Sequence, residues 1–507
     1  MSKNIVICSD GTGNTAIKGR GTNVFKLYEA VDLIGHKIDP ALAPQISIYD
    51  DGVGNEDFKP FKLFAGITGF GLARNVRLLY KSLVRVYDPG DRIFLFGFSR
   101  GAFTVRTLSG LIAVCGILDI ASLPTTEALD RAVKRAYRAY RQEYHTKLAL
   151  LLGRKGNRKL IARFEQRYVR HTNVRIRFIG AWESVDAVGA PWHIGDYINA
   201  TIHRFKFPDL KLGPEVDFAC QALAIDDERR TFHPLLWEHD PRLEQVWFAG
   251  CHSNVGGGYE KQGLSLVTLD WMLRQAQHKA GLRLLASDRA LYREHANVDD
   301  KLFDSRAGTG ILYRWLPRDM EAICARHNVP PLIHLSVLER LAHGTGDYAP
   351  GNIAPFAKVV ITHSDDPIED PPVLGRARAA EAVLHAAHRD GKSLLSRVKL
   401  EVLIGRASYY VYLITCSVVL LAAAFPERTG LARLQPQAFL SFAYRLATSP
   451  LLVLILAGGV GLSYFMAVFS ARRMSAAFSE FWHDEQPKLR EVLEPRQLDD
   501  SPVVTSN

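Results

Sequence analysis

A serine flanked by two glycines is the pattern in this sequence best suited to chemistry. Residues 97–101 read Gly-Phe-Ser-Arg-Gly, after the apolar run Arg92–Phe96 and before a long apolar segment. A strand, a sharp turn with the serine at its tip and a helix together expose a nucleophilic hydroxyl, and glycines are needed because a Cβ would clash with nearby backbone. We therefore expect Ser99 to be a nucleophile, with Gly97 and Gly101 shaping its turn.

A serine hydroxyl needs a base to take its proton, and that base needs a carboxylate to orient it. Among the 17 histidines, His252 is placed best, because it follows the apolar run Gln245–Ala249 and precedes a glycine-rich stretch. The carboxyl ends of parallel strands are where α/β sheets build their sites. His233 is the alternative base, although no clear strand precedes it.

Three acidic residues are candidates for the orienting carboxylate, since Asp and Glu both serve in this role. Glu183 comes just after the predicted strand Val174–Gly180, Asp186 lies a little further on, and Asp226 lies in an acidic stretch. We expect Glu183 to be the acid, with Asp186 and Asp226 as the weaker candidates.

The oxyanion that forms during acyl transfer needs backbone N–H donors. One normally comes from the residue after the nucleophile, here Arg100, and another from the loop after an earlier strand, here Gly11 and Thr12. The same loop also fits phosphatases with an aspartyl nucleophile, but such enzymes need an Asp at the position of Cys8. We therefore expect the loop to serve acyl transfer.

Strands that alternate with helices must position these residues. The runs Asn4–Cys8, Gln45–Tyr49 and Arg92–Phe96 are expected to be strands, with helices at Asn23–Leu33 and Leu72–Tyr87 between them. This alternation is typical of a mostly parallel sheet with helices on both faces. The expected fold class is therefore α/β.

Two apolar stretches near the C-terminal end, residues 408–425 and 450–470, contain no charged residue and are each about long enough to cross a bilayer. We expect them to form a transmembrane hairpin; a pair of buried core helices is the alternative. Lys and Arg are denser on the outer flanks than in the connecting loop, which predicts an inner-membrane protein with its catalytic part facing the cytoplasm. The few apolar residues near the N-terminus are too short a run for a secretory signal.

The positive charge is concentrated in one segment. The net charge is +10, and residues Arg131–Arg170 hold thirteen Lys or Arg against two acids. Their spacing favours helices with one basic face, which we expect to form a cap inserted at about residues 120–172. Membrane lipids with anionic headgroups are the expected partner, and a merely solvated face is the alternative. Nucleic acid is not expected beside membrane spans, and nothing indicates a protein partner.

These patterns divide the chain into four parts. Residues 1–364 are expected to be the catalytic domain, 365–400 a linker and helix, 401–475 the two spans with their loop, and 476–507 a tail. The six cysteines are scattered, without the paired spacing of a zinc or redox site, so no metal or cofactor is expected.

Several of these stretches resemble the α/β-hydrolase catalytic domain of type VI secretion phospholipase effectors and their relatives. The resemblance rests mainly on Pro-Gly-Asp at 89–91 followed by Gly-Phe-Ser-Arg-Gly-Ala at 97–102, and on His-Ser-Asn-Val-Gly-Gly-Gly-Tyr at 252–259. It implies an α/β-hydrolase fold, a triad of serine, acid and histidine, and hydrolysis of glycerophospholipid acyl esters. Two positions depart from the family's usual aspartates, because this chain has Glu183 and Asn254 there.

The sequence as a whole predicts a membrane-anchored serine hydrolase that cleaves acyl esters, with phospholipids as the expected substrate class. Ser99 would form an acyl-enzyme, His252 would move the proton, and Glu183 would orient His252. The alternative is a catalytically silent membrane scaffold or lipid-binding protein that retains the fold, a reading motivated by the two altered acidic positions.

Overall fold

An eight-stranded sheet forms the centre of the protein. The computed structural model describes residues 2–11, 21–51, 70–142, 158–185, 210–308, 313–366, 368–424 and 448–494. The strands are β1 (Asn4–Ser9), β2 (Gln45–Asp50), β3 (Arg92–Phe98), β6 (Ile176–Trp182), β7 (Val216–Ala224), β8 (Leu243–Phe248), β9 (Leu332–His334) and β10 (Lys358–Val360). They lie in the order β10-β9-β8-β7-β6-β3-β1-β2, and every neighbouring pair is parallel. The predicted mostly parallel sheet is therefore confirmed.

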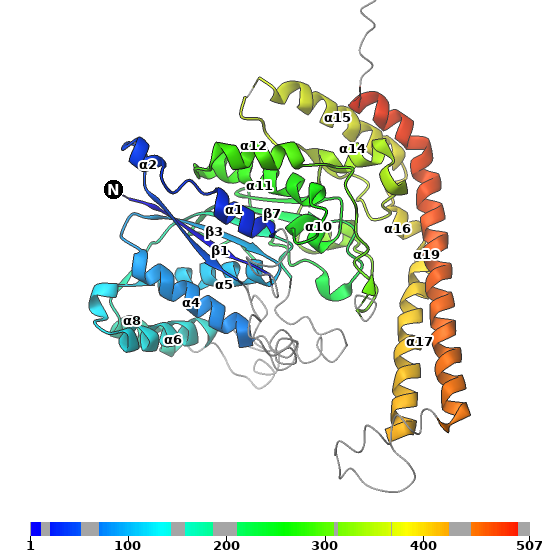
Figure 1. The fold of residues 1–507 in the computed structure, drawn as a ribbon, viewed down its shortest axis with the longest axis horizontal. Helices are drawn as coiled ribbons and strands as arrows, with labels where there is room; N and C mark the ends of the chain where they lie inside the picture. Colours follow the sequence, from blue (N-terminus) through cyan, green and yellow to red (C-terminus); the bar gives the residue numbers. More distant parts are fainter. Residues whose placement is uncertain are drawn as a thin grey trace, which may run out of the picture.

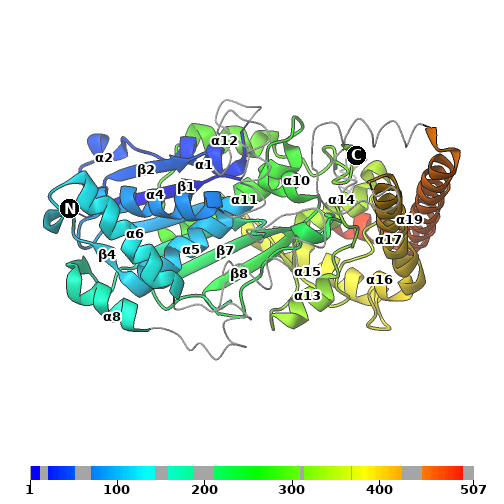
Figure 2. The ribbon, with the colours of Figure 1, turned by 90° about the horizontal axis from the view of Figure 1, so that it is seen from below.

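Helices cover both faces of this sheet, because alternate apolar residues of its strands point to opposite sides. Ile93 and Leu95 of β3 pack with α4 (Phe70–Val86) and α5 (Arg100–Cys115), whereas Phe94 and Phe96 pack with α1 (Asn23–Ala30) and α11 (Gly263–Ala280). Figure 1 shows these helix layers above and below the strands, and Figure 2, seen from below, shows the face that carries α4 and α5. Each face of the sheet therefore has its own buried apolar core, and the strands are held between the two.

The basic segment forms an outer layer on one of these faces. Its two described helices, α6 (Thr126–Gln142) and α8 (Arg158–Arg167), pack against α4 and α5 (Figure 1). The apolar side of α6 is buried there, while Arg131, Lys134, Arg135 and Arg138 are exposed. A small antiparallel pair, β4 (Ile117–Leu118) and β5 (Arg170–His171), closes the segment at its base. The residues between α6 and α8 lie outside the described part of the chain.

The other helices and turns lie around the sheet, and the last of them lead to the C-terminal hairpin. They are α2 (Gly35–Ile38), α10 (His252–Gly256), α12 (Ala286–His295), α13 (Met320–Arg326), α14 (Leu335–His343), α15 (Asp370–Ala387) and α16 (Leu394–Arg397), with the 3₁₀ turns η1 (Ile120–Ser122), η2 (Arg230–Phe232) and η4 (Thr345–Asp347). The acidic, Pro-rich stretch expected as a linker contains the start of α15, with prolines in the first turn, where their missing N–H costs nothing.

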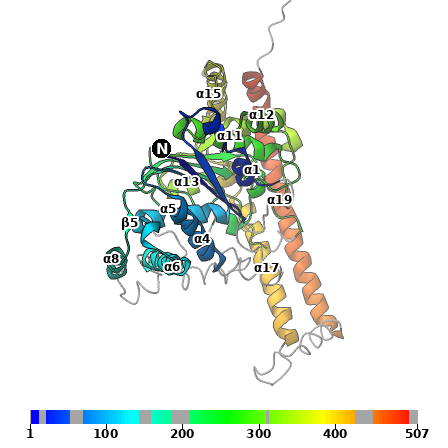
Figure 3. The same ribbon diagram turned by 60° about the vertical axis from the view of Figure 1, so that its left-hand side comes forward.

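Two long helices, α17 (Lys399–Ala424) and α19 (Pro450–Leu493), lie side by side and extend away from the sheet (Figures 1 and 3). Both are long and apolar enough to cross a membrane, judged by length and composition. Small residues allow their close contact: a Cβ on Gly459 would lie 2.1 Å from Thr415, and Ser463 Oγ donates a 2.8 Å hydrogen bond to the Ser408 carbonyl. Most large apolar side chains around this pair are exposed.

The C-terminal half of α19 is part of the globular body. Of the residues expected to form a tail after 475, those up to Leu493 continue the helix and pack against α14 and α15, and residues 495–507 lie outside the described part. Trp482 is buried there, and its Nε1 donates a 2.8 Å hydrogen bond to the Pro350 carbonyl. One uninterrupted helix thus joins the apolar hairpin to the core beside β9 and β10.

Replacing the buried tryptophan of α19 should destabilise the protein much more than replacing an exposed aromatic on the same helix. We expect Trp482→Ala to cost about 3–5 kcal/mol of unfolding free energy, the usual loss for a fully buried large aromatic. Phe465→Ala is the matched control, because Phe465 is 66% exposed. Denaturant unfolding of the detergent-solubilised protein measures both, and equal losses would contradict the docking of α19 described above.

Candidate active site

Ser99 lies at a strained turn between β3 and α5. Its backbone has φ 58° and ψ −120°, a region that costs an L-residue about 1–3 kcal/mol. The turn is held by its surroundings, since the Ser99 N–H donates a 2.9 Å hydrogen bond to the Trp182 carbonyl at the end of β6. The serine is nearly buried, at 7% exposure.

The two glycines around Ser99 are required by close backbone contacts. A Cβ on Gly97 would lie 2.5 Å from the Gly101 carbonyl oxygen, and a Cβ on Gly101 would lie 2.0 Å from the Ser9 carbonyl oxygen. Neither position can carry a larger residue without moving backbone. The turn therefore sits directly against the end of β1.

Glu183 and His252 meet at the carboxyl ends of β6 and β8, the two strands on either side of β7. Glu183 directly follows β6 with φ 49°, and His252 begins α10 just after β8. The His252 Nδ1 atom lies 3.0 Å from Glu183 Oε2, and both side chains are buried. A carboxylate in this position fixes the orientation of the imidazole and leaves its Nε2 edge for another partner.

The His252 ring lies beside the serine turn. It packs on Phe98, the residue before Ser99, with ring centres 4.7 Å apart, and it meets the edge of Phe232 at 4.9 Å. Among the described residues, Ser99 Oγ makes no hydrogen bond to this ring, whose Nδ1 faces Glu183. The structure thus brings Ser99, His252 and Glu183 into one buried cluster.

Arg318 holds the carboxylate of Glu183, a contact that the sequence patterns did not predict. Its two Nη atoms donate to Oε1 at 2.8 Å and to Oε2 at 2.7 Å, and both residues are fully buried. The Ala224 N–H adds a 2.7 Å hydrogen bond to Oε1. Arg318 also donates to the carbonyls of Ala224 and Phe232, so it ties three segments of the site together.

This arrangement sets the charges of the cluster. Burial alone would raise the pKa of Glu183, but the charge and hydrogen bonds of Arg318, together with His252, hold that pKa below its ordinary value. Burial lowers the pKa of His252, and the nearby Glu183 carboxylate opposes the shift only in part. At neutral pH the site therefore holds an ionised carboxylate and a neutral imidazole that can accept a proton.

Asp226 and His233, the other described candidates for the acid and the base, have partners outside the cluster of Ser99, Glu183 and His252. Asp226 accepts hydrogen bonds from the Gly250 N–H at 2.6 Å and the Tyr348 hydroxyl at 3.0 Å, and burial raises its pKa to about 7. His233 Nε2 lies 3.0 Å from the Leu316 carbonyl, and burial lowers its pKa to about 4. Asp186 lies outside the described residues.

Asp227, beside Asp226 in the sequence, supports His252 from its backbone side. The Asp227 carboxylate accepts a 3.2 Å hydrogen bond from the His252 N–H and forms an ion pair with Arg229 at 2.6 Å. Burial would raise the pKa of Asp227, but the Arg229 hydrogen bond and neighbouring positive charges lower it to about 2. The start of α10 is therefore fixed by a permanent negative charge, which suits the positive end of a helix.

The predicted oxyanion donors are described in part. Arg100 is the first residue of α5, where backbone N–H groups have no partner within the helix. The Gly11 N–H donates a 2.6 Å hydrogen bond to Asp10 Oδ1, and Asp10 Oδ2 accepts from the hydroxyls of Thr22 and Tyr49. Thr12 lies outside the described residues. Asp10 therefore anchors the loop after β1 against the rest of the site.

Asn254, one of the two altered acidic positions, has a structural use. Its Oδ1 accepts hydrogen bonds from the backbone N–H groups of Cys251 at 3.3 Å and Phe303 at 3.1 Å, while its Nδ2 donates to the Lys301 carbonyl at 3.1 Å. A carboxylate could not make the last bond, because it has no donor. The amide holds the loop that follows His252.

The segment that carries Arg318 also contacts the C-terminal hairpin. The Leu316 N–H donates to the Glu228 carbonyl at 2.8 Å, next to Asp227 and the site. The neighbouring Trp315 packs with Val398 and Met474 at the base of α17 and α19, so close to Gly405 that a Cβ there would lie 2.5 Å from the indole. A few residues thus connect the hairpin to Glu183.

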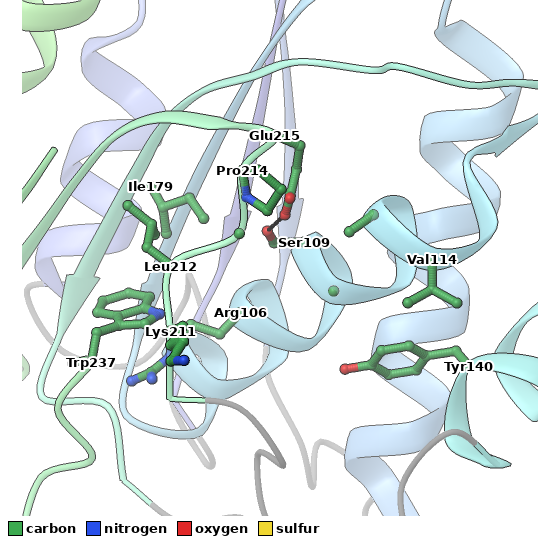
Figure 4. A pocket seen from close by; sticks show the side chains of 13 residues that line it. Arg106, Ser109, Val114, Tyr140, Ile179, Lys211, Leu212, Pro214, Glu215 and Trp237 are labelled. Carbon is green, nitrogen blue, oxygen red and sulfur yellow. Dashed lines mark hydrogen bonds between the residues drawn. The ribbon is translucent and has the colours of Figure 1, made fainter. Parts of the chain in front are cut away.

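A separate small cavity lies on another side of α5 (Figure 4). Its volume is about 180 Å³, and Ser109 Oγ donates a 3.1 Å hydrogen bond to Glu215 in its wall. The Arg106 guanidinium stacks 3.7 Å from the Trp237 ring and donates to the Leu235 carbonyl at 2.6 Å. The cavity is smaller than the usual ligand site of about 300–1,000 Å³. No group of three or more potential metal ligands occurs among the described residues.

Comparison with known proteins points to one family. Residues 3–275, more than half of the chain, match the family model described as the catalytic domain of Tle1-like phospholipase effectors of the type VI secretion system (T6SS). An uncharacterised protein of Saccharomyces cerevisiae is 27% identical over 259 residues, which cover 48% of this chain and 34% of that protein. The chain thus spans about a third of the length of this curated relative.

Two solved structures are also similar to this chain. A Tle1 effector bound to the VgrG spike of the type 6 secretion system matches with 17% identity and a TM-score of 0.28, over 51% of each chain. An uncharacterised protein from Pseudomonas aeruginosa matches with 15% identity and a TM-score of 0.32, over 95% of this chain and 67% of that one.

Removing the positive charge of Arg318 should disable the cluster. Arg318→Met leaves a buried carboxylate without its cation, so we expect a loss of about 3–5 kcal/mol in stability and at least about a hundredfold slower reaction with an acylating or phosphonylating probe. Arg318→Lys should recover part of both. Arg340→Met is the matched control, because buried Arg340 donates hydrogen bonds, among the described residues, to the carbonyls of Val298 and Asp300 and to no carboxylate. It should lose stability but keep probe reactivity, and equal slowing in both variants would refute a specific role for Arg318.

The reaction of Ser99 with such a probe should follow the protonation of His252. Because the pKa of His252 is lowered from its ordinary value of 6.5, the neutral base persists below that pH, and the rate should rise to half its maximum at a pH below 6.5. Glu183→Gln removes the carboxylate that raises the pKa of His252, so the midpoint should move to still lower pH while the maximal rate falls. Labelling rates from pH 4 to 9 on protein shown to be folded measure both effects; a midpoint above 7 would contradict them.

Proposed function

This chain belongs to the family of type VI secretion Tle1-like phospholipase effector catalytic domains, and from that membership we propose that it is a membrane-anchored serine esterase that cleaves phospholipid acyl esters. Family membership suggests lipase-type activity. The observation that carries the serine mechanism is the buried chain of contacts from Arg318 through Glu183 to His252, beside the strained turn of Ser99. An α/β-hydrolase fold in residues 1–364 is part of the same proposal.

The proposed reaction follows from the positions of these groups. Ser99 Oγ attacks the acyl carbonyl while His252 Nε2 takes its proton, and the ionised Glu183 stabilises the resulting imidazolium. The Arg100 N–H donates to the oxyanion. The Gly11–Thr12 loop supplies the second donor, for which the Gly11 N–H would have to exchange its bond to Asp10 for one to the oxyanion. His252 then gives the proton to the departing alcohol, which leaves an acyl-enzyme. Water, activated by His252, releases the fatty acid and restores Ser99.

We further propose that α17 and the apolar half of α19 anchor the protein in the inner membrane. An exposed apolar surface on two adjacent helices is unfavourable in water and suits lipid. The excess of Lys and Arg on the outer flanks favours a cytoplasmic catalytic domain. The exposed basic face of α6 would then meet anionic headgroups as part of the predicted cap.

The decisive test is labelling of the detergent-solubilised protein with a fluorophosphonate, which reacts covalently with an activated serine. We expect the wild type to label and both Ser99→Ala and His252→Ala to fail. Ser109→Ala is a matched control, because Ser109 lies on α5 away from His252 and should leave labelling intact. A folded wild type that does not label would instead support a silent scaffold, in which the fold is kept for binding.

Neutralising the exposed basic face of α6 should reduce activity only on charged membranes. We expect a variant with Gln at Arg131, Lys134, Arg135 and Arg138 to hydrolyse anionic vesicles more slowly, since each basic residue near such a surface contributes about 1 kcal/mol. Hydrolysis of a soluble short-chain ester should be unchanged. Gln at exposed Arg378 and Arg389, which lie in and after α15, is the charge control. Equal loss on both substrates would argue against a lipid-binding role.

A further inference from the structure

A second cavity lies where the globular body meets the hairpin. It is open to the surface, has a volume of about 690 Å³ and is lined by α13, α16 and the first turns of α17. Its apolar lining includes Leu316, Leu395, Val402 and Leu403. This volume falls within the range of about 300–1,000 Å³ that is usual for ligand sites. Ser99, Glu183 and His252 do not line it, so it is distinct from the candidate active site.

Charges of both signs face this cavity from different elements. Lys399 and Arg406, two turns apart on α17, supply two cations. Asp319 and Glu321, at the start of α13, supply two carboxylates. The Arg406 Nε atom is shielded from solvent and has no hydrogen-bond partner in the described part of the chain. A buried donor without a partner is costly, which indicates that a ligand atom can complete it.

The cavity also lies at the boundary between polar and apolar surface. The candidate span of α17 begins at Lys399, and the nearby Leu400 and Leu403 are largely exposed. Figures 1 and 3 show α17 leaving the globular body at this point and running outward beside α19. In a bilayer crossed by this hairpin, such a position is the level of the lipid headgroups, where long basic side chains reach the interface.

We propose that this cavity binds one phospholipid whose headgroup carries both a phosphate and a primary ammonium group, as a bound ligand rather than a substrate; the quaternary ammonium of phosphatidylcholine has no N–H to donate. The phosphate would accept hydrogen bonds from Lys399 and Arg406, and the ammonium would pair with Asp319 and Glu321. The acyl chains would continue along Val402 and Leu403 into the membrane. A purely anionic lipid fits less well, because it would face two carboxylates without a cation of its own. The proposal rests on the membrane anchoring proposed above, but not on catalysis.

A ligand in this cavity would affect the candidate active site through a short stretch of backbone. Leu316 and Pro317, which form part of its wall, directly precede Arg318, and Arg318 holds the Glu183 carboxylate. A lipid that fills the cavity would restrain this segment and so favour the aligned carboxylate. Removing the lipid is expected to lower the unfolding temperature and slow the reaction of Ser99.

The test uses the full chain with Ser99→Ala, so that no bound lipid can be hydrolysed by the proposed mechanism. The protein is purified in mild detergent, stripped of lipid, placed in nanodiscs of phosphatidylcholine spiked with phosphatidylethanolamine or phosphatidylglycerol, and released for native mass spectrometry. We expect one phosphatidylethanolamine per chain to be retained in preference to phosphatidylglycerol. Lys399→Ala with Arg406→Ala should weaken retention by about tenfold or more, a loss of at least about 1.4 kcal/mol.

Two further variants guard against misleading results. Ala325→Trp should fill the cavity and expel the lipid without changing any charge. Arg472→Ala with Arg473→Ala removes two charges from α19 outside the cavity and should leave retention intact. Equal retention in all variants, or a preference for phosphatidylglycerol, would overturn the proposal. Because retention is read without turnover, a failed fluorophosphonate test would leave this result standing, and failed retention would leave the esterase proposal standing.

Discussion

The buried ion pair between Arg318 and Glu183 is the constraint on which the rest of this structure depends. Removing two charges from water costs several kcal/mol each, so a buried pair persists only where further hydrogen bonds complete both partners. Here the Ala224 N–H, the His252 ring and two backbone carbonyls do so. The ends of β6 and β7, the turn η2 and the segment before α13 must therefore meet at one point. The proposed catalytic geometry is a consequence of that meeting.

The same pair explains why the hairpin and the globular body do not behave as separate modules. Arg318 is three residues from Trp315, which is packed between α17 and α19. The second half of α19 is in turn buried against α14 and α15. The hairpin is thus attached to the globular body at two places, through Trp315 and through the C-terminal half of α19. The domain boundary expected at residue 475 falls inside α19. The charged C-terminal half of this helix keeps a buried stripe that contains Trp482 and Leu489.

The sequence was most informative where local pattern and chemistry coincide. Ser99, Glu183 and His252 could be predicted to lie together because each comes at or shortly after the end of an apolar strand, and strand ends share one edge of a parallel sheet. Arg318 could not, because it lies in a stretch without clear periodicity and its partner is 135 residues away. Strand β7 was missed for a related reason: its mixture of polar and small residues has no strand-like alternation, and only its place between β6 and β8 makes it a strand. The described helices of the basic segment pack on α4 and α5 because Leu129, Val133 and Ala136 form an apolar stripe that charge counting hides.

The continuity of α19 has a mechanical consequence for the membrane-anchored esterase proposed above. A helix of 44 residues is about 66 Å long at 1.5 Å per residue, and the hydrocarbon core of a bilayer accounts for only about 30 Å of that length. In a chain anchored as proposed, the remainder of the helix lies outside the bilayer, and its C-terminal end is packed into the protein core. The distance of Ser99 from the lipid surface, and the orientation of its turn, would then be fixed by the fold. Substrates would be limited to lipids whose ester bond can reach Ser99 at that distance.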